Sequence, residues 1–311
     1  MIQIGYDRVH ELAGVGTLVE PLRRAFVSRA HSPERSHHEL DTQNQSGTLL
    51  LMPSWRTDGD IGVKIATVFP GNAAWRLPSV NATYLLLSGK TGQPRACIDG
   101  RALTLVRTAA VSALAADLLA PAKPHTLLMV GTGALSRYLI EGHRAVRDYS
   151  SILIWGRDPQ KANAVARDLQ ARGWPVIAAA DLETAARSAD VISCATLAEQ
   201  PLIQGAWLKT IRHLDLVGSF RPSMREADDD CLRGAFVAVD TPAALKDSGD
   251  LIQPLARGII AEDAIATLGE LIEAQPAPPR PSSTVFKSVG VALADLAVAE
   301  RLHALHTRSA A

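Results

Sequence analysis

The sequence has few of the residues that mark several protein classes. Only 3 of its 311 residues are cysteines, and 5% are aromatic. Cys97, Cys194 and Cys231 are an odd number at wide spacing, which fits neither a disulfide framework nor a zinc motif. The N-terminal MIQIGYDRVHEL has no basic stretch followed by an apolar run, so no signal peptide is expected. These absences predict a reducing, cytoplasmic location.

A charge excess is also lacking, because 32 Lys and Arg balance 32 Asp and Glu. Such a chain has no long-range attraction for phosphate backbones or anionic lipid, so neither nucleic acid nor a membrane is expected as a partner. The apolar runs LLLM (49–52) and LLMV (127–130) are far shorter than the roughly 20 residues of a membrane helix. A hydrophobic share of 47% is typical of a folded chain with a substantial core.

The first part of the chain is patterned as short strands between turns. We expect strands within SGTLLLMPSW, IGVKIATVFPGN, NATYLLLSGKTG and PRACIDG, between residues 46 and 100, which together predict a small antiparallel sheet. The following RTAAVSALAADLLAPA (107–122) predicts a helix that ends before Pro121 and Pro124.

From residue 125 onward, apolar strands alternate with helices. The predicted strands are 125–131, 151–156, 174–180, 189–196, 211–218 and 234–240, and the clearest helices are 134–146 and 158–173. This alternation predicts an α/β domain with a Rossmann-type doubly wound parallel sheet. A proline-rich turn is expected at 276–283, and 289–305 reads as an amphipathic helix that packs onto the first domain.

The segment Gly131-Thr132-Gly133-Ala134-Leu135-Ser136 lies between a predicted strand and a predicted helix. Its first two glycines permit a tight turn and a close approach of backbone to a pyrophosphate, which a helix N-terminus attracts. Ser136 stands where the fingerprint has Gly or Ala, so the motif by itself is weak. Its place in the first strand–helix unit of a parallel sheet favours dinucleotide binding through Gly131, Gly133, Ala134 and Leu135.

The end of the second strand indicates which dinucleotide is bound. NAD sites usually carry an acid here, whereas this strand ends Trp155-Gly156-Arg157. Arg157 is suited to a 2′-phosphate, so we expect NADPH to be preferred, with NADH as an accepted alternative. Asp158 is expected to cap the next helix.

Several segments resemble the ornithine cyclodeaminase/mu-crystallin family. They are LLLMP (49–53), VKIATVFPGN (63–72), LTLVRTAAVSALAADLLA (103–120), GTGALS (131–136), VGSFRPSMREAD (217–228), GDLIQPL (249–255) and FKSVGVALADLAVAE (286–300). The resemblance implies a smaller α+β substrate-binding and dimerisation domain over 1–120 and 290–311, around a Rossmann domain over 121–289. It also implies a homodimer.

The same resemblance implies that Arg35, Lys64 and Arg107 face the substrate. Two guanidiniums and an ammonium bind an α-carboxylate through charge-assisted hydrogen bonds. Lys64 is the expected catalytic residue, because a lysine in a water-poor cleft beside two arginines has a lowered pKa and exchanges protons near neutral pH. Arg107 is expected to open a helix, where a cation opposes the dipole, so a structural role is disfavoured.

Further cofactor contacts are implied by the resemblance: Ser79, Arg107, Thr108, Thr196, Val217, Gly218 and Ser288. Thr196 has independent support, because it ends a predicted strand, and the carboxyl ends of parallel strands face the ligand crevice.

The segment VGSFRP (217–222) separates activities within the family. Cyclodeaminases resemble one another in an Asp beyond the second glycine of VGGD, where this chain has Gly218-Ser219-Phe220. The expected activity is therefore NAD(P)H-dependent reduction of a cyclic α-imino acid, Δ1-pyrroline-2-carboxylate or Δ1-piperideine-2-carboxylate, to proline or pipecolate. The alternatives are ornithine cyclodeamination, reductive amination as in alanine dehydrogenases, and NADPH-dependent binding of a small ligand as in mu-crystallin.

Other polar groups were assigned no catalytic or metal-binding role. His31, His37 and His38 lack partners at ligand spacing, and no metal site is expected. Asp228-Asp229-Asp230 is expected to complement a helix dipole. Asp295 lies on the last predicted helix, and the sequence does not decide between a cleft position and a solvated or capping one.

Overall fold

The computed structural model describes residues 1–210, 212–274 and 282–309. The chain divides into two compact units: unit 1 comprises Met1–Thr108 with Val291–Ala311, and unit 2 comprises Ala109–Gly290. Most of the predicted proline-rich turn at 276–283 lies outside the described residues.

Unit 1 is built on a seven-stranded sheet in the order β1-β7-β6-β5-β4-β2, with β3 paired to β4. The strands are β1 (Ile2–Ile4), β2 (Ala30–His31), β3 (Ser36–Asp41), β4 (Ser46–Arg56), β5 (Ile61–Val68), β6 (Val80–Leu87) and β7 (Pro94–Asp99). The four predicted strands are confirmed as β4 to β7. These four strands pair antiparallel, as predicted, whereas β1, which was not predicted, extends the sheet by pairing with β7 in parallel. With three residues, β1 is too short to carry a period-2 pattern.

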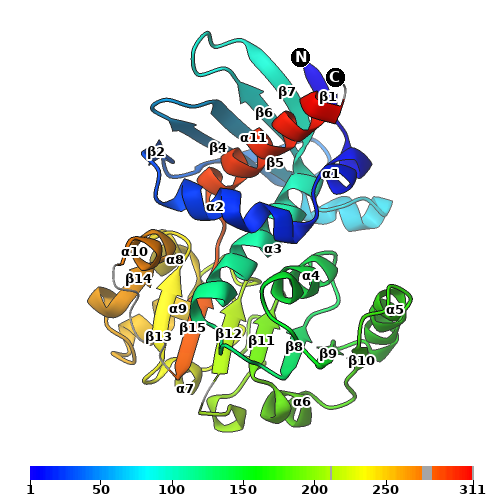
Figure 1. The fold of residues 1–311 in the computed structure, drawn as a ribbon, viewed down its shortest axis with the longest axis vertical. Coiled ribbons are helices and arrows are strands. Elements are labelled where there is room, and N and C mark those ends of the chain that lie inside the picture. The colour runs from blue at the N-terminus through cyan, green and yellow to red at the C-terminus, as the bar shows by residue number, and fades with distance from the viewer. Residues whose placement is uncertain (211, 275–281, 310–311) are drawn as a thin grey trace. The chain divides into compact units, whose positions relative to one another are not determined.

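One face of this sheet is covered by helices. The helical elements of unit 1 are α1 (Tyr6–Leu12), η1 (Val15–Leu18), α2 (Val19–Phe26), η2 (Pro70–Trp75) and α11 (Ala292–Ser309). The red helix α11 lies across β4, β5 and β6 in Figure 1, which confirms that the last helix packs onto the first part of the chain. Gly62, Lys64 and Ala66 of β5 are buried on one face of the strand, so a lysine occupies a core position.

The long helix α3 (Gly100–Leu119) begins earlier than predicted and ends where expected. Its second half belongs to unit 2, because Ser112 donates to Asp215 at 3.1 Å and Leu119 accepts from Thr284 at 3.3 Å. The division at 108/109 therefore differs from the predicted boundary at residue 120. Among the described helices α3 alone is long and apolar enough to cross a membrane, and 83% of that stretch is buried, as in a core helix.

Unit 2 contains an eight-stranded sheet in the order β10-β9-β8-β11-β12-β15-β13-β14, and all its pairs are parallel. The strands are β8 (Thr126–Val130), β9 (Ser151–Trp155), β10 (Val176–Ala178), β11 (Val191–Cys194), β12 (Arg212–Leu216), β13 (Phe236–Val239), β14 (Ile265–Thr267) and β15 (Ser283–Lys287). The six predicted strands and the doubly wound fold are confirmed, whereas β14 and β15 were missed. The strand order reverses between β8 and β11, where ligands bind in such sheets.

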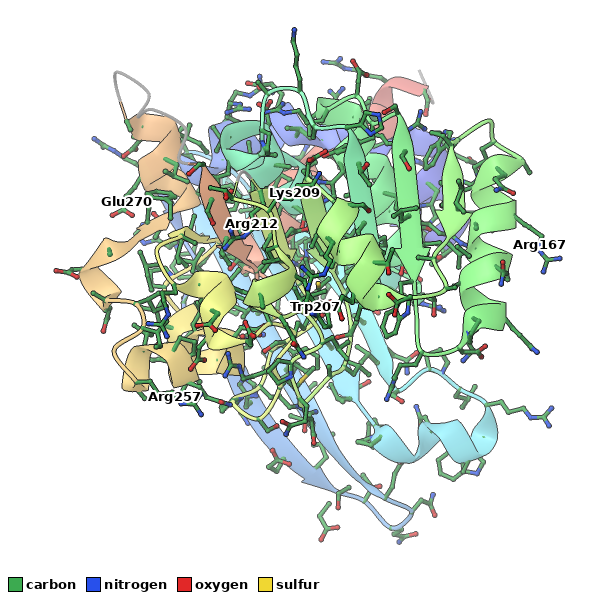
Figure 2. The ribbon with its side chains drawn as sticks, turned by 90° about the horizontal axis from the view of Figure 1, so that it is seen from below. Arg167, Trp207, Lys209, Arg212, Arg257 and Glu270 are labelled. Carbon is green, nitrogen blue, oxygen red and sulfur yellow. The ribbon has the colours of Figure 1, made fainter. Side chains whose placement is uncertain are left out.

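The helical elements of unit 2 connect these strands (Figure 1). They are α4 (Ser136–Val146), α5 (Pro159–Gln170), α6 (Leu182–Ser188), η3 (Gly205–Trp207), α7 (Asp229–Leu232), α8 (Ala244–Asp247), α9 (Gly249–Ala256), η4 (Glu262–Ala264) and α10 (Leu268–Glu273). In α5 the spacing sets the buried face: Val165 and Leu169 point inward, and Arg167 points outward (Figure 2). Cys194 lies in the core, as predicted, and all three cysteines are unpaired.

Candidate functional site

The turn between β8 and α4 has the geometry of a dinucleotide-binding loop. Gly131 has φ of 120°, which disfavours any residue with a Cβ, and a Cβ there would also collide with the carbonyl of Ala195. Gly133 faces open space. The buried hydroxyl of Ser136 donates to the Gly131 carbonyl at 2.8 Å. The serine that weakened the sequence motif therefore fixes the first glycine of the turn.

A cavity of about 520 Å³ opens beside this turn. It is lined by segments that follow three neighbouring strands: Gly131, Thr132 and Gly133 after β8, Trp155 to Asp158 with Lys161 after β9, and Ala195 to Ala198 with Leu202 after β11. Because the open glycine backbone at Gly133, in the turn that leads into α4, lines this cavity, its residues fit the pyrophosphate of a dinucleotide.

The segment that follows β9, the second strand of the predicted Rossmann domain, presents two cations to the cavity. Arg157 is exposed, and Lys161 in the first turn of α5, which was not predicted, lines the same cavity. Asp158 caps α5, as predicted, by accepting from Gln160 N at 2.9 Å and Lys161 N at 3.4 Å. The signal for Lys161 was a second basic residue in the first turn of the helix that Asp158 caps.

The other predicted cofactor contacts of unit 2 follow strands of the same sheet. Thr196 lies two residues after β11, and Val217 and Gly218 follow β12; all three are half-buried. Ser288 follows β15, is 1% exposed, and donates its hydroxyl to Asp240 at 2.7 Å. Thr196 lines the cavity described above, whereas Val217, Gly218 and Ser288 do not.

Unit 1 holds a buried ionic cluster. Asp295 of α11 has no exposed surface and accepts from Lys64 Nζ at 2.8 Å and from Arg107 Nε at 3.0 Å. Lys64 and Arg107 are 4% and 6% exposed. Within the described residues, Arg107 bonds only through Nε, so its terminal nitrogens face no protein acceptor. Such a guanidinium is suited to an anionic ligand.

The cluster changes the acidity of Lys64. Burial lowers the pKa of Lys64 to about 8, the attraction of Asp295 opposes this, and the charges of Arg107 and then Arg35 lower the pKa further. The lowered pKa is as predicted, although burial is the larger cause. Arg35, between β2 and β3, is half-buried and close enough for its charge to affect Lys64. The structure thus brings Lys64 and Arg107 together on one carboxylate, and the charge of Arg35 acts on Lys64.

One expectation about this cluster needs correction, and the question that the sequence left open about Asp295 is answered. Arg107 does not open a helix, because α3 begins at Gly100 and Arg107 lies inside it; the dipole argument for a ligand role is therefore wrong. Asp295 is neither solvated nor a cap. An acid within the apolar run VGVALADLAVA was the signal that it needs a buried partner, because isolated charges are rarely buried.

The remaining predicted contacts, Ser79 and Thr108, take no part in the ion pairs of Asp295 with Lys64 and Arg107. Ser79 precedes β6 and is half-buried, and its carbonyl accepts from Phe69 N at 2.7 Å. Thr108 is 6% exposed and follows Arg107 in α3. In the VGSFRP segment, Ser219 is buried and donates to Met224 O at 2.7 Å, and Phe220 is 43% exposed.

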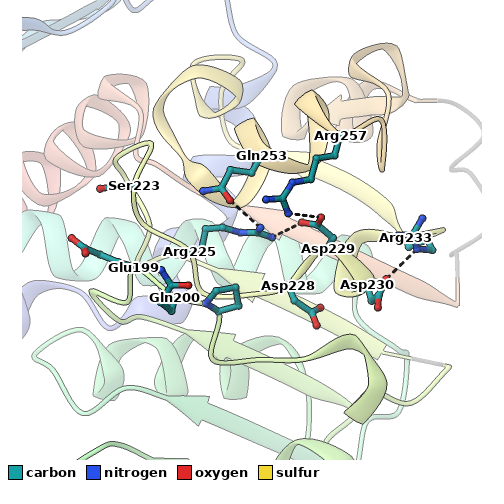
Figure 3. A pocket seen from close by; sticks show the side chains of 11 residues that line it. Glu199, Gln200, Ser223, Arg225, Asp228, Asp229, Asp230, Arg233, Gln253 and Arg257 are labelled. Carbon is teal, nitrogen blue, oxygen red and sulfur yellow. Dashed lines mark hydrogen bonds and ion pairs between the residues drawn. The ribbon is translucent and has the colours of Figure 1, made fainter.

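A second cavity of unit 2, of about 540 Å³, is lined by residues that form ion pairs with one another (Figure 3). Asp229 bridges Arg225 at 2.9 Å and Arg257 at 2.8 Å. Asp228 caps α7 through Cys231 N, as predicted for the acidic run. No group of three metal-ligating side chains occurs in the part of the chain that the structure describes. Because the arginines drawn in Figure 3 are paired with aspartates, this cavity offers little to an anion.

Comparison with known proteins agrees with this geometry. The model of the ornithine cyclodeaminase/mu-crystallin family matches residues 4–307. The chain belongs to this family. A Δ1-pyrroline-2-carboxylate reductase of Colwellia psychrerythraea is 34% identical over 308 residues, covering 95% of this chain and 96% of the relative.

Two solved structures of family members are also similar. One is Δ1-pyrroline-2-carboxylate reductase from Thermococcus litoralis in complex with NADH and L-proline, with 28% identity, a TM-score of 0.92, and coverage of 100% of this chain and 98% of that one. The other is an archaeal alanine dehydrogenase dimer with bound NAD, with 25% identity, a TM-score of 0.90, and coverage of 100% and 97%.

Proposed function

We propose that this protein reduces a cyclic α-imino acid with NAD(P)H, converting Δ1-pyrroline-2-carboxylate to L-proline and Δ1-piperideine-2-carboxylate to L-pipecolate. The observation that carries the proposal is the buried Lys64–Asp295–Arg107 cluster, which combines an anion-binding guanidinium with an ammonium of lowered pKa. The names of the similar reductases support the same reaction.

The substrate carboxylate binds to the terminal nitrogens of Arg107 and to Arg35. Both are guanidiniums, which pair with carboxylates through two parallel hydrogen bonds. Asp295 holds Arg107 by Nε and so fixes the direction in which the other nitrogens point. Lys64 and Arg107 share the single carboxylate of Asp295, which leaves an excess of positive charge for an anionic substrate.

Lys64 is the catalytic acid. Its pKa of about 8 keeps the ammonium mostly protonated at neutral pH, yet ready to release a proton. The proton goes to the imine nitrogen and the hydride to the imine carbon, so the C=N double bond becomes a C–N single bond with new C–H and N–H bonds. When bound, the nicotinamide supplies the hydride for the carbon.

The cofactor is held by Gly131, Gly133, Ala134 and Leu135 at the turn, with Ser79, Arg107, Thr108, Thr196, Val217, Gly218 and Ser288 as further contacts. Arg157, joined by Lys161, binds the 2′-phosphate, so NADPH is preferred and NADH is also accepted.

A homodimer forms through the outer face of the unit 1 sheet. That face carries the cross-strand pairs Leu51–Ile65 and Val63–Leu85, whose side chains are half-buried in the single chain. A continuous apolar face of this kind is typical of an interface. Light scattering of the wild type should give a dimer, and Val63→Lys should give monomers.

A cytoplasmic location of the protein is also part of the proposal.

The test is a screen of NADPH oxidation with each cyclic imine and with pyruvate plus ammonium. We expect turnover with the imines alone, in which proline or pipecolate accumulates. Ammonium-dependent turnover of pyruvate without imine reduction would favour an alanine dehydrogenase. Release of ammonia from ornithine would favour a cyclodeaminase. Tight NADPH binding without any turnover would favour a mu-crystallin-like binding protein.

A further inference from the structure

Glu226 is a buried carboxylate with none of the roles described above. It lies between β12 and α7 and has no exposed surface. Its Oε1 accepts from Thr196 N at 2.7 Å and Thr196 Oγ1 at 2.9 Å, and its Oε2 accepts from Gly218 N at 2.6 Å. One carboxylate therefore joins the segments that follow two neighbouring strands.

The position of this carboxylate in the sheet is specific. The ladder between β11 and β12 ends at the pair Cys194–Leu216, and Thr196 and Gly218 each lie two residues beyond it. Their backbone N–H groups both point to Glu226. A Cβ at Gly218 would collide with the backbone of Thr196 and with the carboxylate itself, so the approach requires glycine.

Glu226 is itself held at its backbone. Its N–H donates to Asp250 Oδ1 at 2.7 Å, and its carbonyl accepts from the N–H groups of Leu202 and Ile203 at 2.9 and 3.0 Å. Asp250 in turn pairs with the fully buried Lys287 at 3.3 Å. Because the backbone is fixed on both sides, the carboxylate is preorganised rather than free to follow the two loops.

We infer that Glu226 is a positioning residue of the dinucleotide site, which holds Thr196 and Gly218 where they contact the cofactor. The inference rests on the proposed function, in which both residues bind NAD(P)H. Glu226 does not itself touch the cofactor; it acts through the two N–H groups and the hydroxyl that it accepts.

Charged neighbours make this role sensitive to pH. Burial raises the pKa of Glu226 to about 7, Lys287 opposes the rise, and Asp250 increases it. Cys194 of β11 is the other titratable group whose charge interacts with Glu226. Only the ionised carboxylate accepts at both oxygens. Cofactor affinity should therefore increase as the pH rises through about 7.

The test titrates wild type, Glu226→Gln and a matched control, Asp215→Asn, with NADH. NADH is used because it lacks the 2′-phosphate, whose own protonation would add to the pH dependence of binding. Asp215 is a fully buried acid of the same unit that binds Ser112, His143 and Ser193 instead of cofactor loops. Hydrogen exchange at residues 195–197 and 217–219 is measured without cofactor. Glu226→Gln presents an amide N–H to the Gly218 N–H, so we expect at least about a tenfold higher Kd, or ~1.4 kcal/mol.

We also expect faster exchange in both segments of Glu226→Gln and a near-wild-type Kd for Asp215→Asn at an equal loss of Tm. The wild-type Kd for NADH should fall between pH 6 and 8. Unchanged NADH binding in Glu226→Gln, or an equal loss in Asp215→Asn, overturns the positioning role alone. If Glu226→Gln does not fold, a wild-type Kd independent of pH between 6 and 8 overturns it. Failure of the wild type to bind NADH overturns the proposed function, and this inference with it.

Discussion

The two units assemble their ligand-binding residues in different ways. In unit 2 the cavity is lined by short segments that directly follow β8, β9 and β11, so the parallel sheet brings them together. In unit 1 the partners of the ionic cluster come from distant parts of the chain, with Lys64 and Asp295 231 residues apart. In a parallel sheet the loops that follow the strands lie at the same edge, whatever the sequence of each loop. A buried ion pair forms only if the two elements that carry its partners pack in one particular register.

The units also differ in how far their charges are desolvated. Arg157 at the unit 2 cavity is exposed, and Asp295 of unit 1 is fully buried. Electrostatic interactions strengthen as water is excluded. We therefore expect substitutions in unit 1 to have larger effects than those in unit 2.

Asp295→Ala should have the largest effect, because it leaves Lys64 and Arg107 buried without a counter-ion. Removing one partner of a buried pair costs about 3–5 kcal/mol of unfolding free energy. Urea unfolding measures this loss. Glu183→Ala, which breaks the exposed pair with Arg187, is the control and should cost less than about 1 kcal/mol. Equal losses in the two variants would contradict the contrast between the units.

Arg107→Ala should come next. It removes the carboxylate clamp, at a cost of about 2–3 kcal/mol in kcat/KM for the imine, mainly as a higher KM. Because Arg107 is also a proposed cofactor contact, affinity for NADH in the absence of imine should fall as well, but by less than the affinity for the imine. An unchanged KM for the imine would show that Arg107 does not bind the substrate.

The pH dependence of reduction should follow Lys64. Because the protonated form is the acid, kcat/KM should fall above a pH of about 8, up to tenfold per pH unit. Asp295 raises this pKa, so Asp295→Asn should move the fall to lower pH. A flat rate profile from pH 7 to 10 would exclude Lys64 as the acid.

The lowered pKa of Lys64 also affects folding. Since the pKa in the folded protein is below the unfolded value of 10.5, burial of Lys64 lowers the free energy of unfolding below pH 8. That cost disappears as the pH rises to 10.5.

Arg157→Ala should have the smallest effect. An exposed guanidinium facing a phosphate contributes about 1 kcal/mol, so the KM for NADPH should rise by roughly fivefold and the KM for NADH should stay the same. Lys161→Ala is the companion variant and should act in the same direction. Equal changes for both cofactors would remove the 2′-phosphate assignment.

The contrast between the units also explains what the sequence predicted. The six predicted strands of unit 2 and the turn at Gly131 carry local signals, namely apolar runs and glycines at fixed spacing, and these predictions are confirmed. The apolar run around Asp295 indicates a buried partner, but that this partner is Lys64 has no local signal, since it depends on how α11 packs on β5. The strands β1 and β14 were missed for a related reason: each has three residues, and its pairing with a neighbouring strand defines it.

The most direct test of the account combines turnover and binding in Lys64→Met. With Δ1-pyrroline-2-carboxylate and NADPH, the wild type should form L-proline, and Lys64→Met should lose about 10²- to 10⁴-fold in kcat, as expected for a missing general acid. NADPH affinity without imine should stay within a factor of about two, because the dinucleotide contacts lie mainly in unit 2. Wild-type rates in Lys64→Met, or no proline from the wild type, would contradict the account.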